Sequence, residues 1–360
     1  MSKVISGIQQ IGIGVTNLYE AWRWYIKAFG VDIRIFEDDT VAELMLPYTG
    51  GKPQKRHAAL AVNLDGGGGF EIWQYSQRRP LPPMEPPRLG DLGIFAAKIK
   101  CFDIDIAYSH LQSSGATMLS PITKSPSGQR HFYINDPYDN TFELVEEKCD
   151  WFRKSGKPTG ATYGAVIGVS DMDKALPVYQ EILGFDKILY NSTGNFIDMA
   201  ELPGGNQVFK RVILTHSQPR KGPFSRMLGN GQIELVQTVE RKSVKIFENR
   251  FWGDLGFIHL CFDIRNMNAL EKECNDKGFP FTVNSNANKN QGESFDMGEA
   301  AGHFTYIEDP DGTLIEFVET HKLPILKKLG IYLNLKNRQA EKPLPNWIIN
   351  MLGLKRVNNL

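Results

Sequence analysis

The chain has 360 residues, of which 41% are hydrophobic and 23% charged, and its 41 basic and 41 acidic side chains cancel. This composition is ordinary for a globular protein of about two domains, and the charge balance argues against a general nucleic-acid-binding protein, which carries a basic excess. No apolar run approaches the roughly 18 residues of a membrane span. The sequence begins without a recognisable signal peptide and its four cysteines lack CxxC spacing, so we expect a cytoplasmic protein with reduced thiols.

The first 30 residues predict a strand followed by a helix. Asn17 is a typical N-cap residue and Gly30 a typical stop, and the helix between them is rich in aromatic residues. A later stretch repeats this pattern, with Asp171 as the cap and Gly184 as the stop. Because the spacing of cap, tyrosine and stop is the same in both stretches, we interpret them as copies of one unit.

A second kind of unit also occurs twice. One copy begins near Ala96 and its helix stops at Gly115, and the other begins at His259, with Asn266 as cap and Gly278 as stop. Apolar stretches broken by turns follow each helix, which is typical of strands. All four units close on a strand in which a glutamate stands between apolar residues. These glutamates are Glu71, Glu143, Glu234 and Glu316.

The chain is therefore predicted to repeat a strand, a helix and about three further strands four times, which makes an α+β protein. We expect one domain at 1–148 and a second at 161–320, joined by a polar linker at 149–160. The fourth unit is longer than the second, and we expect the additional residues in the loop at 284–288.

A C-terminal tail at 321–360 lies outside the repeats. Trp347, Ile348, Met351 and Leu352 are spaced to share one face of a short helix. We expect this helix to pack on the body of the protein, and a helix on a membrane surface or a partner is the alternative.

The fourth unit also contains residues suited to bind a metal. Alternation places His259, Cys261 and Asp263 on one face of the predicted strand 257–263. Glu316 lies in an apolar strand, where burial is costly unless something pairs with the carboxylate. An imidazole and a carboxylate on facing strands can bind one metal ion. The alternative for His259 is a core histidine that is satisfied by hydrogen bonds.

This four-fold unit, with the motifs IHLCFDI at 258–264 and YIEDPDGTLIEFVE at 306–319, resembles the vicinal oxygen chelate superfamily. That superfamily includes glyoxalase I, methylmalonyl-CoA epimerase, extradiol dioxygenases and bleomycin-resistance proteins. The resemblance covers 8–320 and implies that two units face each other as a cupped half-barrel. It also implies a divalent metal held by the start of each first strand and the glutamate of each last strand.

The resemblance leaves two arrangements of ligands open. The first-strand positions are Gln10, Ala96, Gly164 and His259. If the first and fourth units pair crosswise, the implied set is the one characteristic of glyoxalase I: Gln10, Glu71, His259 and Glu316. If each domain forms its own site, the first offers Gln10, Glu71 and Glu143 and the second offers Glu234, His259 and Glu316. We favour the crossed arrangement because Ala96 and Gly164, which cannot bind metal, then fall together in one blank site.

The implied activity is that of a metal-dependent lyase or isomerase of the glyoxalase I type. A ligand set of nitrogen and oxygen suits Zn, Ni, Co, Mn or Fe, and the metal would polarise a carbonyl while a glutamate moves a proton. Glu316 is the first candidate for this glutamate and Glu71 the second. The candidate substrate contacts are Trp73, Tyr75, His303 and Tyr306. The last two could instead be surface and packing residues.

The positions that bind glutathione in glyoxalase I correspond here to Gly14, Tyr75 and Leu255. The resemblance therefore implies a small carbonyl or thioester-type substrate, more apolar than glutathione, in a monomer or homodimer. One alternative is an extradiol or hydroxyphenylpyruvate-type Fe(II) dioxygenase, although Gly164 removes one of its two histidines. Another is a protein that sequesters a ligand without catalysis.

Overall fold

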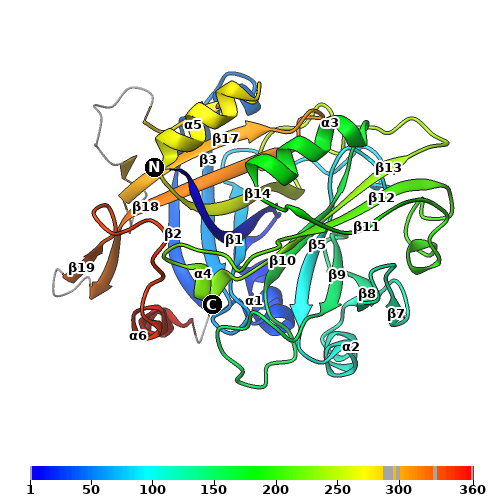
Figure 1. Cartoon of the computed structure of the whole chain (residues 1–360), viewed down its shortest axis with the longest axis horizontal. Helices are drawn as coiled ribbons and strands as arrows, with labels where there is room; N and C mark the ends of the chain where they lie inside the picture. Colours follow the sequence, from blue (N-terminus) through cyan, green and yellow to red (C-terminus); the bar gives the residue numbers. More distant parts are fainter. Residues whose placement is uncertain (1, 287–294, 297–300, 327–330, 358–359) are drawn as a thin grey trace.

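The structure is a computed structural model, and it describes residues 2–286, 295–296, 301–326, 331–357 and 360. Two curled sheets lie side by side, and the longer helices cover their outer faces (Figure 1). Residues 287–288 of the predicted insertion at 284–288, together with 289–294 and 297–300, lie outside the described part. No described helix is long and apolar enough to cross a membrane.

The first sheet is 10-stranded and takes its strands from both ends of the chain. In order across the sheet, the strands are β15 (Val283–Asn284), β17 (Ala301–Glu308), β18 (Leu314–Leu326), β14 (Gly256–Arg265), β1 (Val4–Gly14), β4 (Gly69–Tyr75), β3 (Gln54–Val62) and β2 (Ile33–Ala42), with β16 (Phe295–Asp296) paired to β17 and β19 (Ile331–Asn334) paired to β18. At its centre, β1 runs antiparallel to β14.

The second sheet is 9-stranded and comes from the continuous segment 93–238. Its strands, in order, are β11 (Lys187–Gly194), β12 (Phe209–Thr215), β13 (Gln232–Thr238), β10 (Thr162–Gly168), β5 (Gly93–Cys101), β9 (Thr141–Glu146), β8 (Arg130–Asn135) and β6 (Thr117–Met118), with β7 (Thr123–Lys124) paired to β8. The crossed arrangement is thus confirmed, because the first unit shares a sheet with the fourth and the second with the third. Neither 1–148 nor 161–320 contains a complete sheet by itself. These ranges remain a proposal about where the repeats begin and end.

The helices are α1 (Leu18–Phe29), α2 (Ile104–Ser113), α3 (Met172–Pro177), which continues as the π-helix η2 (Val178–Ile182), α4 (Ser225–Leu228), α5 (Met267–Asp276) and α6 (Asn346–Asn350), with the 3-10 helices η1 (Leu46–Tyr48), η3 (Ile197–Met199) and η5 (Met351–Lys355). The predicted caps Asn17 and Asp171 each accept backbone N–H groups of the first turn. Asn266 precedes α5, but its side chain makes no capping bond. Instead, the carboxylate of Glu319 accepts the N–H groups of Asn266 and Met267.

Each aromatic helix is joined to the turn of the following unit by one hydrogen bond, and the two bonds are equivalent. The hydroxyl of Tyr25 in α1 donates to Asp136 at 2.7 Å, and that of Tyr179 in η2 donates to Asp309 at 2.8 Å. All four residues are buried. The repeat seen in the sequence therefore includes its tertiary contacts.

The tail differs in detail from its prediction. Residues 346–355 are helical, as α6 and η5, and Leu352 is buried as expected. Ile349 is also buried, whereas Trp347 is 62% exposed. The buried face therefore contains Ile349 and Leu352 and is shifted from the predicted one.

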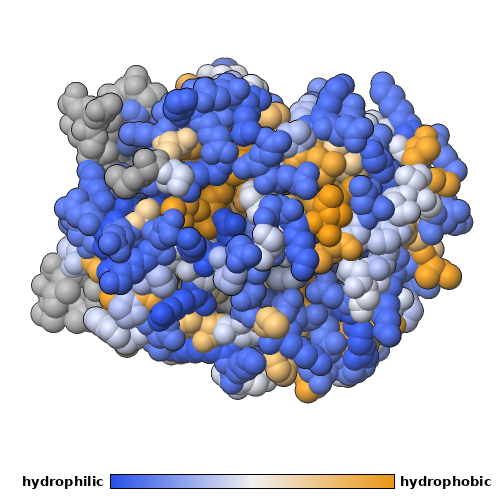
Figure 2. Space-filling model, viewed as in Figure 1, coloured by the Kyte–Doolittle hydropathy of each residue, from blue (hydrophilic) through white to orange (hydrophobic). Residues whose placement is uncertain are grey.

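The core lies between the sheets and their helices. Along each central strand one set of alternating side chains faces the helices, as Leu260 and Phe262 do in β14. The other set faces the concave side of the sheet. Figure 2 shows a mostly hydrophilic surface, with apolar side chains gathered in patches over the middle of the molecule. The concave face of the first sheet is where the candidate site lies.

Candidate metal centre

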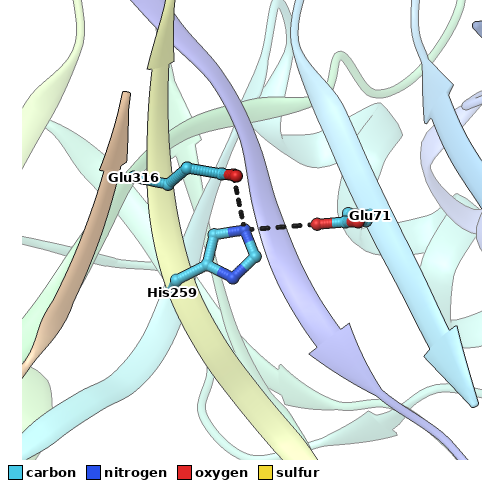
Figure 3. A group of neighbouring side chains, drawn as sticks. All are labelled: Glu71, His259 and Glu316. Carbon is cyan, nitrogen blue, oxygen red and sulfur yellow. Dashed lines mark ion pairs between the residues drawn. The ribbon is translucent and has the colours of Figure 1, made fainter. Parts of the chain in front are cut away.

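Four side chains from four strands meet on the concave face of the first sheet. His259 of β14 lies between Glu71 of β4 and Glu316 of β18, with its Nε2 atom 3.4 Å and 3.1 Å from their Oε2 atoms (Figure 3). Gln10 of β1 completes the group, because its Nε2 atom donates to the same two oxygens at 3.4 Å and 3.3 Å. The structure thus brings together Gln10, Glu71, His259 and Glu316.

Gly12 makes room for the imidazole. It pairs directly with His259 across the β1–β14 ladder, and a Cβ atom at this position would lie 2.3 Å from Cε1 of the ring. Next to this pair β14 holds one additional residue, Ile258, which packs with the aromatic side chains above the site. Gly12 could not be identified from the sequence, because a glycine in a strand indicates a close approach without showing which group comes close.

Burial and like charge act strongly on the two carboxylates. Burial, reinforced by Glu316, raises the pKa of Glu71 to about 7. Burial opposes ionisation of Glu316 too, but the charge of His259 and hydrogen bonds from His259, Cys261 and Tyr306 outweigh it and lower its pKa. For His259, burial is outweighed by Glu316 and Glu71, which raise its pKa. The group therefore favours a positive charge at its centre.

The polar atoms of the group fit a metal ion. Glu71, His259 and Glu316 each offer one ligand atom, and these atoms lie within 4.8 Å of one another. Gln10 Oε1 and His259 Nδ1 are buried and have no hydrogen-bond partner among the described residues, and His259 Nε2 faces the two carboxylate oxygens. The amide of Gln10 can turn over to present Oε1 to the centre, because which end is oxygen is assigned from its hydrogen bonds. A divalent ion would bind Gln10 Oε1 and His259 Nε2 and separate the carboxylates.

Aromatic side chains enclose the group. The ring of Trp252 stacks parallel to His259 with centroids 6.2 Å apart, and the ring of Tyr306 stands edge-on to it at 5.5 Å. Trp73 packs against Trp252, and the hydroxyl of Tyr75 donates to the Trp252 carbonyl. Trp252 comes from the loop before β14 and was missed, because nothing in its local sequence marks that contact. Of the predicted substrate contacts, Trp73, Tyr75 and Tyr306 thus surround the group.

His303 lies elsewhere. It pairs with Glu319 in the β17–β18 ladder, and its Nε2 atom bonds Asn284 Oδ1 at 2.8 Å. Burial lowers its pKa to about 4. A structural role at the edge of the sheet accounts for these contacts.

A cavity of about 430 Å³ adjoins the aromatic enclosure. Trp252 and Ile258 contribute to its wall, and both also belong to the cluster above His259. The remaining aromatic lining residues are Tyr48, Phe247, Phe251 and Phe257. Trp252 therefore stands between this cavity and the candidate metal position.

The corresponding face of the second sheet holds an ion-pair network. Lys98 of β5 reaches Glu143 at 2.6 Å and Glu234 at 2.7 Å. Arg211 bonds Glu234 at 2.5 Å and Asp198 at 2.8 Å. The alternative ligand set with Glu234 is therefore wrong for this fold, since Glu234 lies in the second sheet and His259 and Glu316 in the first.

Comparison with known proteins agrees with this architecture. The sequence profile of the Glyoxalase/Bleomycin resistance protein/Dioxygenase superfamily matches residues 7–144 and 164–317. A putative dioxygenase from Bacillus subtilis superposes with a TM-score of 0.52 and 13% identity, over 88% of this chain and 86% of that one. Glyoxalase I from Zea mays gives a TM-score of 0.51 and 13% identity, over 88% of this chain and 92% of that one. A search of curated protein sequences found no match.

Two curled sheets built from four repeats define a tandem α+β protein, and the first sheet holds a buried Glu–His–Glu group that could bind a metal ion. The profile match extends over most of the chain. The chain belongs to the Glyoxalase/Bleomycin resistance protein/Dioxygenase superfamily.

Proposed function

We propose that the chain is a metal-dependent lyase or isomerase of the glyoxalase I type. The observation that carries the proposal is the convergence of Gln10, Glu71, His259 and Glu316 in one buried site with unsatisfied polar atoms. Gln10 and His259 come from opposite ends of the chain and meet through pairing of β1 with β14. Because the chain completes this site by itself, a monomer suffices.

The proposed ligands are Gln10 Oε1, His259 Nε2 and one oxygen each of Glu71 and Glu316. A divalent ion held there would act as a Lewis acid on a carbonyl oxygen of the substrate. On a substrate with a hydroxyl group on the carbon beside that carbonyl, Glu316, or else Glu71, would take the proton from that carbon and return it to the former carbonyl carbon. The hydroxyl proton passes to the former carbonyl oxygen, so the carbonyl and the hydroxyl change places without an oxidant. The surrounding aromatic rings exclude water from this transfer.

The surroundings favour a small apolar carbonyl compound over a glutathione adduct. Glutathione carries two carboxylates, for which an arginine fork is the best partner. The guanidinium of Arg78 is near the site, but Asp254 already binds it at 2.7 Å. Tyr75 is engaged with the Trp252 carbonyl. Aromatic rings form much of the wall of the adjoining cavity and suit an apolar body. Lys245, Arg250, Glu308 and Asp311 also line it, and the Arg250 guanidinium is already bound by backbone carbonyls.

The test is metal content together with isomerase activity. We expect about one divalent ion per chain in the purified protein, lost in His259→Ala and reduced in Gln10→Ala. Glu316→Gln should lower kcat by 10²-fold or more, whereas the exposed control Glu201→Gln should leave it unchanged. Absence of metal after reconstitution with Zn, Ni, Co, Mn and Fe would contradict the proposal and favour a ligand-sequestering protein.

The dioxygenase alternative is disfavoured by the site itself. An Fe(II) oxygenase of this kind uses two histidines and one carboxylate, and the group here contains one histidine. Oxygen consumption by the iron-loaded protein with an aromatic keto acid or catechol would revive it.

A further inference from the structure

The second sheet keeps both glutamates of the repeat and places a lysine between them. We propose that the ammonium of Lys98 is the resident cation of the second sheet, and that removing it opens a second site for a divalent metal ion. The comparison with the first sheet rests on the proposed function given above. The experiment below does not, because it reads out the second sheet alone.

The strand register supports the comparison. In the first sheet, β14 pairs with β18 so that Cys261 stands opposite Glu316. In the second, β5 pairs with β9 so that Lys98 stands opposite Glu143. Lys98 therefore takes the place of Cys261, and its longer side chain extends to the centre of the concave face. Ala96, two residues earlier, stands at the position of His259 and offers no ligand atom.

The glutamates on either side correspond as well. Glu71 pairs with Gly12 in the β1–β4 ladder, and Glu234 pairs with Val166 in the β10–β13 ladder. The two carboxylates of the second sheet are thus held as in the first. Lys98 Nζ contacts Oε2 of Glu143 at 2.6 Å and Oε2 of Glu234 at 2.7 Å.

Charge explains why a cation is needed there. The side chains of Lys98, Glu143 and Glu234 are at most 2% exposed. Two carboxylates so close together in a buried site cannot both ionise without positive charge beside them. Arg211 supplies it to Glu234 alone, whereas Lys98 supplies it to both carboxylates. Burial alone would lower the pKa of Lys98, but Glu143 and Glu234 raise it, so the ammonium stays charged.

The remaining members of the network hold the carboxylates in place. His131 Nδ1 bonds Glu143 Oε1 at 2.8 Å, and Arg211 Nε bonds Glu234 Oε1 at 2.5 Å. Each glutamate thus keeps its Oε1 atom for the surrounding shell and turns Oε2 to Lys98. This is how outer partners orient carboxylate ligands around a metal. With Lys98 shortened, the two Oε2 atoms would offer hard oxygen ligands that suit Mn²⁺ or Mg²⁺, with water completing the coordination.

The experiment uses the full chain in a His259→Ala background, so that the first sheet does not contribute. Mn²⁺ binding is followed by electron paramagnetic resonance and by the shift in Tm on titration. His259→Ala alone should bind no Mn²⁺ in the second sheet. His259→Ala/Lys98→Ala should bind one Mn²⁺ per chain, with a Kd at least tenfold below that of any residual binding by His259→Ala, and its Tm should rise with Mn²⁺. Lys98→Arg in the same background keeps the charge and should bind none.

The source of the ligands is checked by adding Glu143→Gln, which should abolish the new binding. Uptake that survives Glu143→Gln, or no uptake by the Lys98→Ala chain, overturns the proposal. If Lys98→Ala does not fold during expression, it is refolded from denaturant with and without Mn²⁺. Recovery in Mn²⁺ alone supports the proposal, and equal failure in both conditions overturns it. A wild-type protein without metal would refute the proposed function and leave this test intact.

Discussion

At the scale of single residues, Gly12 is the most constrained position of the candidate site. Gly12→Ala would place a methyl group 2.3 Å from the His259 ring, so the imidazole must move. We expect a loss of stability of about 1–3 kcal/mol, as for other overpacked sites, and weaker metal binding. Tm and metal content measure these effects. Gly194→Ala is the matched control in a strand, because nothing lies within 4 Å of its added carbon; an equal loss in both variants would contradict the prediction.

Asp263 predicts a dependence of stability on pH. Burial raises the pKa of its carboxyl to about 7, against an ordinary value of 3.8. The folded state therefore keeps a proton that the unfolded state releases, and stability is full below about pH 4 and falls as the pH rises toward 7. The loss is at most roughly 4 kcal/mol.

Asp263→Asn removes this titration. Urea denaturation should show the variant close to the wild type at pH 4 and more stable than it at pH 8. The exposed Asp39→Asn serves as control, and its difference in stability from the wild type should not grow between pH 4 and pH 8. A constant difference between Asp263→Asn and wild type across this range would contradict the prediction.

Single residues also show how far sequence reasoning reached into the site. Glu316 and His259 could be singled out because a polar side chain in an apolar strand needs a partner. Lys98 and Trp252 were not identified, because their roles depend on which strand or loop faces them. A lysine among apolar strand residues carries the same signal as Glu316, and it could have been weighed in the same way.

At the scale of elements, the two tyrosine–aspartate bonds hold each helix to the next unit. Tyr25→Phe and Tyr179→Phe each remove a hydroxyl from a buried carboxyl group. We expect each to cost about 1–3 kcal/mol, since the aspartate loses a hydrogen bond. The effects should add in the double variant, because the two pairs share no residues. Chemical denaturation measures all three. Tyr108→Phe is the control and should change little, because the Tyr108 hydroxyl has no hydrogen-bond partner among the described residues.

Helix starts were predicted well where the cap is local. The side chains of Asn17 and Asp171 bond N–H groups two or three residues ahead, so a short stretch of sequence contains the whole interaction. The start of α5 depends on Glu319, which lies more than 50 residues away along the chain. A distant cap of this kind has no local signature.

At the scale of the whole molecule, the crossed arrangement predicts how the site behaves when the chain is cut. Residues 154–156 are exposed, so the chain can be divided there into two fragments. Neither fragment holds both Gln10 and His259, and neither should bind the metal alone. Metal binding should return when the fragments are coexpressed, as measured in the copurified complex. Stoichiometric metal on one fragment alone would place the site within a contiguous half.

The repeated pattern of strands was enough to predict the sheets from the sequence. The choice between crossed and contiguous pairing of the units rested on an indirect argument. The choice assumed that Ala96 and Gly164 lie together in one blank site. In the structure Lys98 and Arg211 fill that site, so it is occupied by cations and not blank. Pairing between units is decided by strand edges and packing surfaces, which short motifs do not record.

The continuity of the second sheet has a consequence for synthesis on the ribosome. Every strand of that sheet has been made once residue 238 has been added, so this sheet can form before the first one. The first sheet must wait, because β1 has no partner in β14 until residues 256–265 are made. Until then the apolar residues of β1 lack the strand that covers one edge, and such long-range pairing is slow. We therefore expect the N-terminal 75 residues to depend on chaperone protection for longer than the middle of the chain.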